Sequence, residues 1–199
     1  MQGFLAAFAM TESASYRRGS LICDSAGWGG LKGLPMDIEF RPARDEDIPE
    51  LARLVAGIAA YHESMDPRAR FDWDEIRDAP NWLKAVLHRD HHAVFVADHG
   101  AGRLVGYLWV HLRRDRQGYL PRVRGYISHA FMDESWRGQG LMRPMLEMAY
   151  DWFRSKDIEI VTLTVLHRNW LGSSAWYKAG YEDWTHERRI ELKPRSKLP

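Results

Sequence analysis

The fold of this chain is decided by residues 123–142, which read VRGYISHAFMDESWRGQGLM. The first half of this stretch, Val123 to Met132, is mostly apolar and aromatic, which predicts a long strand. A glycine turn, Arg137-Gly138-Gln139-Gly140, comes next. Apolar residues then recur at helical spacing, at Leu141, Met145, Met148, Ala149 and Trp152. The stretch therefore predicts a strand, a glycine turn and a helix in succession.

The glycine turn has the composition of an anion-binding site. Glycine lets the backbone approach a ligand closely, and the first N–H groups of a helix have no partner within it. Together with the helix dipole and the side chain of Arg137, these donors suit a pyrophosphate. The alternative is an ordinary strand-to-helix turn, in which Gly138 and Gly140 serve only the backbone dihedral angles.

Strands and helices alternate on both sides of this stretch. Before it, we expect a strand over 37–41, a helix capped by Asp45 or Asp47, a second helix capped by Asp78, and strands over 93–97 and 104–112. The last two strands form an antiparallel hairpin because their connection is short. After it, we expect a buried strand over 158–166, a helix from Trp170 to Lys178 and an edge strand over 181–192.

This order of elements predicts a mixed α/β (α+β) fold. A run of antiparallel strands followed by strand–helix–strand–helix gives a mostly antiparallel central sheet with helices on both faces. Residues 1–35 are rich in Gly, Ser and Ala and lack periodicity, so we expect a flexible N-terminal extension there and one domain over 36–199.

Composition excludes several classes of function. The chain has 199 residues and a formal net charge of +1, so no overall field selects nucleic acid or an anionic membrane. One cysteine, Cys23, excludes an internal disulfide and a four-thiolate zinc site. No apolar run reaches the roughly 18 residues that span a bilayer, and the first ten residues make a poor signal peptide. We therefore expect a soluble cytoplasmic protein that binds neither membrane nor nucleic acid.

A second motif lies about thirty residues after the first, where Asn169 is followed by Gly172, Trp176, Gly180 and Tyr181. With the glycine turn, it resembles the two signatures of the GNAT superfamily of N-acetyltransferases. The order of elements from Asp37 onward is similar too. The resemblance implies the GNAT fold, which has a mixed, mostly antiparallel sheet flanked by helices.

The resemblance implies an enzyme that transfers an acetyl group from acetyl-CoA to an amine by direct attack. It assigns cofactor binding to Phe131, Met132, Arg137, Gly138, Gln139, Gly140, Leu141, Met142 and Asn169. A bulge in the fourth strand, expected near Phe131 and Met132, would offer an N–H group to the thioester oxygen. Met142 departs from the family pattern, because Gly or Ala is usual there.

The resemblance leaves the proton-transfer residues open. Tyr177 is one place after the position of the family's usual tyrosine, where this chain has Trp176, so Tyr177 is either the proton donor or a packing residue. His129 is the one side chain of the long strand with a suitable pKa for a base, and its alternative is a packed strand histidine. A water relay to Glu134, Glu63 or Asp72 is a third option.

Residues 61–75 correspond to the wall of the acceptor site in this family. Their mixture of aromatic and carboxylate side chains suits a cationic amine, and a solvated loop is the alternative. We expect a small-molecule amine or amino-acid-like acceptor. Two other functions stay open, a non-catalytic acyl-CoA-binding module and a protein N-acetyltransferase, and a homodimer stays open as well.

Two further clusters have simpler interpretations. His88, His91 and His92 match no zinc template, so we expect a surface cluster and no metal. The basic residues between Arg113 and Arg124 suit the CoA 3′-phosphate, an RNA backbone or a solvated hairpin loop, of which the last is the expectation.

Overall fold

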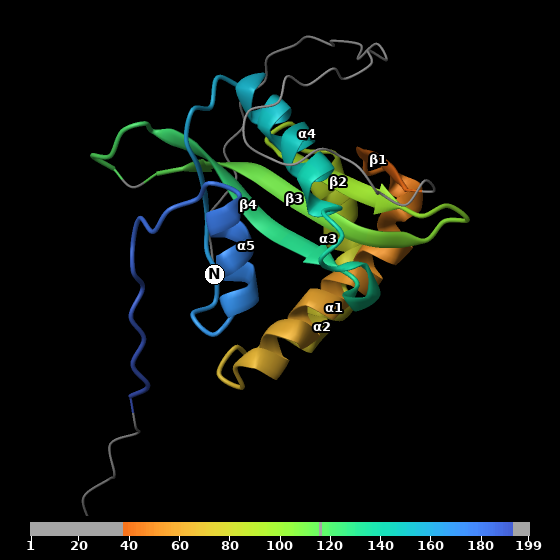
Figure 1. The fold of residues 1–199 in the computed structure, drawn as a ribbon, viewed down its shortest axis with the longest axis horizontal. Helices are drawn as coiled ribbons and strands as arrows, with labels where there is room; N and C mark the ends of the chain where they lie inside the picture. Colours follow the sequence, from red (N-terminus) through yellow and green to blue (C-terminus); the bar gives the residue numbers. More distant parts are fainter. Residues whose placement is uncertain (1–37, 116, 193–199) are drawn as a thin grey trace, which may run out of the picture. The chain divides into compact units, whose positions relative to one another are not determined.

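The computed structural model describes residues 38–115 and 117–192 (Figure 1). The strands are β1 (Glu39–Pro42), β2 (His92–Asp98), β3 (Leu104–Arg114), β4 (Val123–Met132) and β5 (Val161–Leu163). The α-helices are α1 (Ile48–Met65), α2 (Trp73–Arg77), α3 (Ala79–Leu87), α4 (Met142–Arg154) and α5 (Trp170–Lys178). Two short 3-10 helices are η1 (Asp45–Asp47) and η2 (Glu134–Trp136). The extension expected over 1–35 lies outside the described residues.

The strands form one sheet in the order β1-β2-β3-β4-β5. The first four strands pair antiparallel with their neighbours, and β5 pairs parallel with β4. The mixed, mostly antiparallel sheet predicted from the order of elements is therefore confirmed. Among the described residues, no helix has the length and apolarity needed to cross a membrane.

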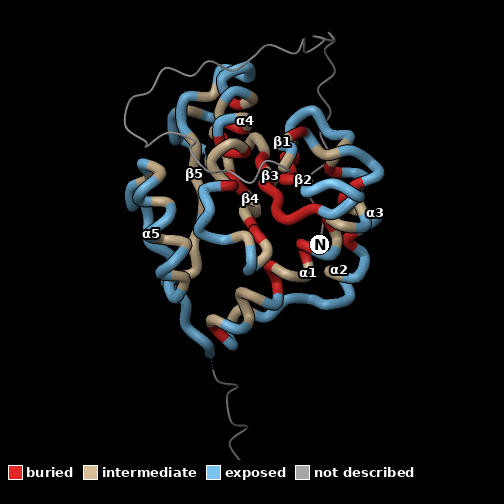
Figure 2. Tube along the Cα trace, turned by 45° about the vertical axis from the view of Figure 1, so that its right-hand side comes forward, coloured by how far each residue is buried: buried red, intermediate tan, exposed pale blue. Residues whose placement is uncertain are grey.

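Helices cover both faces of the sheet because alternate strand residues point to opposite sides. Val94 and Val96 of β2 join a core with α1 and α3, whereas Phe95 and Ala97 join a second core with α4. Figure 2 shows the buried residues gathered along the central strands and the adjoining helices. The buried face of α1 follows the helical spacing of apolar residues in the sequence and includes Leu51, Leu54, Val55 and Ile58.

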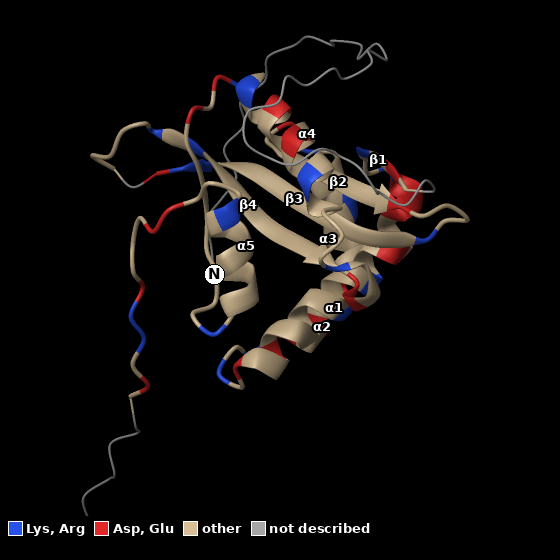
Figure 3. Ribbon diagram, viewed as in Figure 1, with Lys and Arg blue, Asp and Glu red and all other residues tan. Residues whose placement is uncertain are grey.

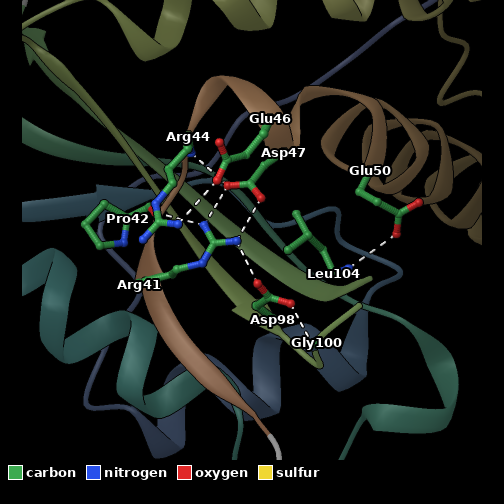
Figure 4. Close-up of polar contacts among 9 residues, drawn as sticks. All are labelled: Arg41, Pro42, Arg44, Glu46, Asp47, Glu50, Asp98, Gly100 and Leu104. Atoms are coloured by element: carbon green, nitrogen blue, oxygen red, sulfur yellow. Dashed lines mark hydrogen bonds and ion pairs between the residues drawn. The ribbon is translucent and has the colours of Figure 1, made fainter. Parts of the chain in front are cut away.

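A buried ion-pair network joins β1, η1 and the end of β2 (Figure 4). Both terminal nitrogens of Arg41 donate to Asp47, at 2.7 and 2.8 Å, and Nη2 also donates to Asp98 at 2.7 Å. Asp47 was expected to cap α1, and it stands at the N-cap position. Its carboxylate, however, accepts from the Arg44 N–H and from Arg41 instead of from an N–H of α1, so the predicted N-cap position is confirmed but the capping hydrogen bond does not form.

Of two predictions about residues 158–192, one is wrong and the other is confirmed only in part. The segment 181–192 forms no strand, and Trp184, Ile190 and Leu192 are exposed. Charged side chains recur through this segment, which leaves it no continuous apolar face to bury. The strand expected over 158–166 forms as β5, but only over Val161–Leu163, and its three residues are half-buried because no strand of the described residues covers its other side.

Candidate functional site

Strand β4 contains a bulge at Ser128. Trp109 pairs with His129 and Val110 pairs with Ile127, so Ser128 is an extra residue in β4. The bulge was expected near Phe131 and Met132, but these residues pair regularly with Tyr107 and Gly106. The expected bulge in the fourth strand is therefore present, but its expected position is wrong, because the position of a bulge depends on the register between two strands.

The bulge changes which backbone groups of β4 face β5. Before it, the Gly125 N–H donates to Ile160 O of the β5 side at 2.9 Å. After it, the Asp133 N–H donates to Val105 O of β3 at 2.8 Å. The backbone groups of Phe131 therefore also face β3, and those of Ala130 and Met132 point away from β3, towards the other edge of β4. Because β5 pairs only with Gly125–Ile127, the backbone groups of Ala130 and Met132 lie on an edge that no strand covers in the described part of the chain.

The glycine turn leads from this edge into α4. Gly138 and Gly140 have φ angles of +75° and +76°, a left-handed conformation that favours glycine. The N–H groups of Gly138, Gln139, Gly140 and Leu141 have no acceptor among residues 38–115 and 117–192. The turn therefore offers several backbone donors at the start of α4, as the sequence predicted.

Arg137 joins this turn to α1 and β4. Its Nε donates to Met132 O at 2.9 Å, and its guanidinium lies 4.4 Å from the Tyr61 ring centroid and 5.4 Å from that of Phe131. The side chains of Phe131 and Met132 are buried in the two cores. Those two residues can therefore reach a ligand mainly through their backbone, and Met132 is the one whose N–H faces the uncovered edge.

Asn169 and Tyr177 lie at opposite ends of α5. The Asn169 side chain is the N-cap of this helix and accepts from the Gly172 N–H at 2.9 Å. Tyr177 is half exposed, and its hydrogen bond with Asp183 raises its pKa. Trp176 instead packs in the α4-side core, with its ring centroid 5.2 Å from that of Tyr181. Trp176 therefore lies on the inward face of α5, and Tyr177, one residue later, lies on its outward face.

A cavity of about 270 Å³ lies on the opposite face of the sheet from α4. Its lining comes from α1, the segment 71–76, α3, β3 and β4, and consists of Val55, Ile58, Ala59, His62, Phe71, Asp72, Glu75, Ile76, Trp82, Trp109 and His129. Four of these residues belong to the predicted acceptor wall over 61–75. Glu63 has a supporting position, because its carboxylate accepts from the Phe71 N–H at 3.0 Å and from the Trp73 Nε1 at 3.2 Å.

His129 lies at the wall of this cavity formed by the sheet. Because of the bulge, Ser128 and His129 both project to this face, where Ser128 Oγ lies 2.7 Å from His111 Nδ1. His129 Nδ1 lies 2.8 Å from the hydroxyl of the fully buried Tyr107. Burial lowers the pKa of His129 to about 4 and also lowers the pKa of His62, so both rings are neutral near neutral pH. Tyr177 does not line this cavity.

The remaining clusters have protein partners. His88 pairs with Asp45 at 3.0 Å, and His92 accepts from Trp109 Nε1 at 3.0 Å. No group of His, Cys, Asp and Glu in the described residues could hold a metal ion. Figure 3 places basic residues where β3 ends and β4 begins. Of these, Arg113 lies 4.8 Å from the Tyr126 ring centroid and Arg124 pairs with Asp115 at 2.6 Å.

Residues 56–181 match the model of the acetyltransferase (GNAT) family. The chain belongs to this family. No curated protein matches the sequence. The GNAT assignment agrees with both motifs, because the matched range spans the glycine turn and ends at Tyr181.

Solved structures share the fold at low sequence identity. A mutant BH1408 protein from Bacillus halodurans is 21% identical with a TM-score of 0.68, over 78% of this chain and 99% of that one. A predicted acetyltransferase with acetyl-CoA from Clostridium acetobutylicum is 17% identical with a TM-score of 0.60, over 78% and 96%. Glucosamine-6-phosphate N-acetyltransferase from Arabidopsis thaliana is 14% identical with a TM-score of 0.58, over 78% and 99%. Family and fold together support acetyl transfer in general.

Sequence reasoning missed part of this GNAT site. Trp82 and Trp109 line the cavity, and Tyr107 holds His129, yet none of the three was singled out. A signal existed for two of them. Tyr107 and Trp109 alternate along a strand of a predicted hairpin, so they share a face, and the neighbouring strand carries His129.

Proposed function

We propose that this GNAT protein transfers the acetyl group of acetyl-CoA to a primary amine of a small molecule. One feature of β4 carries the proposal. This strand has the backbone N–H groups of Ala130 and Met132 on an edge that no strand covers in the described part of the chain, and on its face it places His129 in the wall of a cavity. A single strand thus lies beside a suitable place for the thioester and a suitable place for the amine.

The residues present fit a CoA thioester. Within the turn from Arg137 to Met142, the N–H groups of residues 138–141 have no acceptor in the described part of the chain and are available to a pyrophosphate. The backbone of Met132 would hold the pantetheine beside β4, with Phe131 supporting it, and Asn169 would contact the same arm. Acetyl-CoA supplies the activated acetyl group, whose carbonyl oxygen gains charge as the amine attacks and is stabilised by an N–H donor.

The acceptor must lose a proton to react. An amine with a pKa near 10.4 is almost wholly protonated at neutral pH, and reaching the neutral form costs roughly 4–5 kcal/mol. The apolar wall of the cavity lowers this cost, because burial disfavours the ammonium form. The neutral nitrogen then attacks the thioester carbon, the new C–N bond replaces the C–S bond, and the nitrogen loses its extra proton.

His129 is the proposed acceptor of that proton. It is neutral, it lines the cavity, and its Nδ1 is held by Tyr107, so the ring has a fixed orientation. Tyr177 is the proposed proton donor to the departing thiolate. A thiolate with a pKa near 8.5 needs only modest help, which suits an exposed group on α5.

The test combines binding and turnover with the purified full chain. Calorimetric titration with acetyl-CoA should show one saturable site, and a panel of primary amines should release free CoA in its presence. Binding without turnover on any amine or peptide would support the non-catalytic alternative. Turnover of peptide N-termini alone would support a protein N-acetyltransferase, and absence of acetyl-CoA binding would refute the proposal altogether.

A further inference from the structure

The cavity has a charged mouth and an apolar interior. Asp72 and Glu75 are exposed, whereas the deeper walls come from α1, Trp82 and Trp109. Among the lining residues in the described part of the chain, these two carboxylates are the only groups with a formal charge near neutral pH, and no Lys or Arg is present. The cavity is therefore electrostatically suited to cations, and anionic acceptors find no partner there.

The mouth carboxylates retain free acceptor capacity. Glu75 has no hydrogen bond or ion pair through its carboxylate among residues 38–115 and 117–192, and Asp72 uses Oδ1 alone, for the N–H groups of Asp74 and Glu75. Of the other acidic residues of this region, Asp74 pairs with Arg77, Asp66 pairs with Arg68, and Glu63 accepts the hydrogen bonds from Phe71 and Trp73 described above. Among the described acidic residues of this region, Glu75 and the Oδ2 atom of Asp72 are thus the acceptors without a partner, and both residues line the cavity.

Aromatic rings lie between the mouth and the sheet. Phe71 stacks with His62 at a centroid distance of 6.0 Å, and Trp82 stacks with Trp109 at 5.6 Å. Trp82 Nε1 donates to the Glu75 backbone oxygen at 3.2 Å, which ties the ring to the segment that carries the carboxylates. Aromatic faces attract cations and also pack well against methylene groups.

We propose that the acceptor is an alkyl diamine whose distal ammonium binds Asp72 and Glu75 while the other nitrogen reacts beside His129. This inference rests on the proposed acetyl transfer and names its substrate class. The methylene chain would lie along the apolar wall of α1 and the tryptophan pair. A simple monoamine leaves the mouth carboxylates without a partner, whereas a diamine uses both ends of the cavity and its wall.

The proposal also fixes the product. Acetylation of the inner nitrogen forms one amide bond, releases free CoA and leaves the outer ammonium unchanged, so the product is a monoacetylated diamine. A second acetylation would require the amide end to occupy the acidic mouth, where it carries no charge for the carboxylates. A cavity of about 270 Å³ is smaller than the 300–1,000 Å³ of typical drug-sized sites, which favours a small acceptor over a multi-ring one.

The experiment compares matched acceptors with matched variants. Putrescine is paired with butylamine and cadaverine with pentylamine, so each pair differs only in the distal cation. We expect kcat/KM for the diamine to exceed that for its monoamine by about tenfold. Two partly exposed ion pairs with the distal ammonium provide binding free energy of this order. The double variant D72N/E75Q should remove this advantage, because it should lower kcat/KM for the diamine about tenfold more than for the monoamine, and added salt should reduce the advantage in the wild-type chain.

Asp74→Asn is the control for the single variant Glu75→Gln, because each removes one negative charge from α2 and Asp74 does not line the cavity. Asn is chosen at position 72 because Asp72 is the N-cap of α2 and an asparagine side chain can also accept the capping hydrogen bonds. Equal turnover of diamine and monoamine by the wild-type chain, or an equal loss on both in D72N/E75Q, would overturn the inference.

A binding measurement separates this inference from the proposed function. If no amine is acetylated, the thermal shift of the wild-type chain with cadaverine is compared with that with pentylamine. A larger shift with the diamine that disappears in D72N/E75Q supports the inference although acetyl transfer has failed. Equal shifts refute the inference whether or not transfer occurs.

Discussion

The hydroxyl of Tyr107 lies 2.8 Å from Nδ1 of His129. Tyr107 is fully buried, and burial raises its pKa well above the ordinary value, so the phenol keeps its proton. If that proton is donated to Nδ1, the other ring nitrogen of His129 carries a hydrogen and acts as a donor. If Nδ1–H donates to the phenol oxygen, Nε2 has a free lone pair. His129 can therefore act as a base only in the second arrangement.

This pair gives the first prediction. His129→Gln should lower kcat by about 100-fold, the lower end of the range for general acid–base catalysis, with little change in acetyl-CoA binding. Tyr107→Phe keeps the ring and should lower kcat by about tenfold, because Nδ1 loses its partner. Steady-state kinetics with both substrates varied separates kcat from KM. A rise in amine KM alone in both variants would assign the pair to binding instead.

The pH dependence of the rate gives the second prediction. Because burial lowers the pKa of His129 to about 4, this ring does not change charge between pH 5 and 8. Over that range log(kcat/KM) should rise with a slope of one, since only the neutral amine fraction changes. A change of slope near pH 6.5, the ordinary pKa of histidine, would show that His129 titrates as an exposed group and would contradict its burial in the site.

The same shift predicts acid sensitivity of the fold. His129 and His92 have their pKa values lowered to about 4 by burial, against 6.5 when unfolded. Between these values the unfolded chain binds more protons than the folded one, so stability falls as pH drops from 6.5 towards 4. Thermal unfolding followed across this range should show a falling Tm. His129→Gln should make the decline shallower, and an unchanged slope would contradict the assignment.

The buried network of Arg41 gives a prediction about stability. Asp47→Asn should destabilise the fold by about 2–4 kcal/mol, because it leaves a buried guanidinium with Asp98 as its remaining carboxylate partner. Glu46→Gln is the control, since its pair with Arg44 is exposed and should be worth less than about 1 kcal/mol. Urea unfolding measures both. Burial alone would raise the pKa of Asp47, but the hydrogen bonds from Arg41 and from the Arg44 N–H outweigh burial, so the pKa of Asp47 is below its ordinary value.

The sequence predicted the features that depend on local pattern. The limits of β4, the buried face of α1 and the glycine turn follow from periodicity and from glycine. Features that depend on pairing between distant segments were not predicted: the bulge at Ser128 is set by the register against β3, and the contact between Tyr107 and His129 needs two strands side by side. The segment 181–192 was wrongly read as a strand because strand formation there depends on a partner edge as well as on composition.

The glycine turn allows a prediction in which backbone strain and ligand binding can be separated. Gly140 has a φ of +76°, and no atom within 4 Å would meet an added Cβ, so Gly140→Ala should cost about 1–2 kcal/mol of strain without a clash. Gly100 has a φ of +89° in the β2–β3 turn, with equally open space, so Gly100→Ala should cost a similar amount. If the backbone donors of 138–141 hold the pyrophosphate, only Gly140→Ala should also weaken acetyl-CoA binding, because the strained residue turns its N–H away. Urea unfolding and calorimetric titration of both variants measure the two effects independently. Equal loss of stability with equal acetyl-CoA affinity in both variants would show that Gly140 serves the fold alone and that the phosphates bind elsewhere.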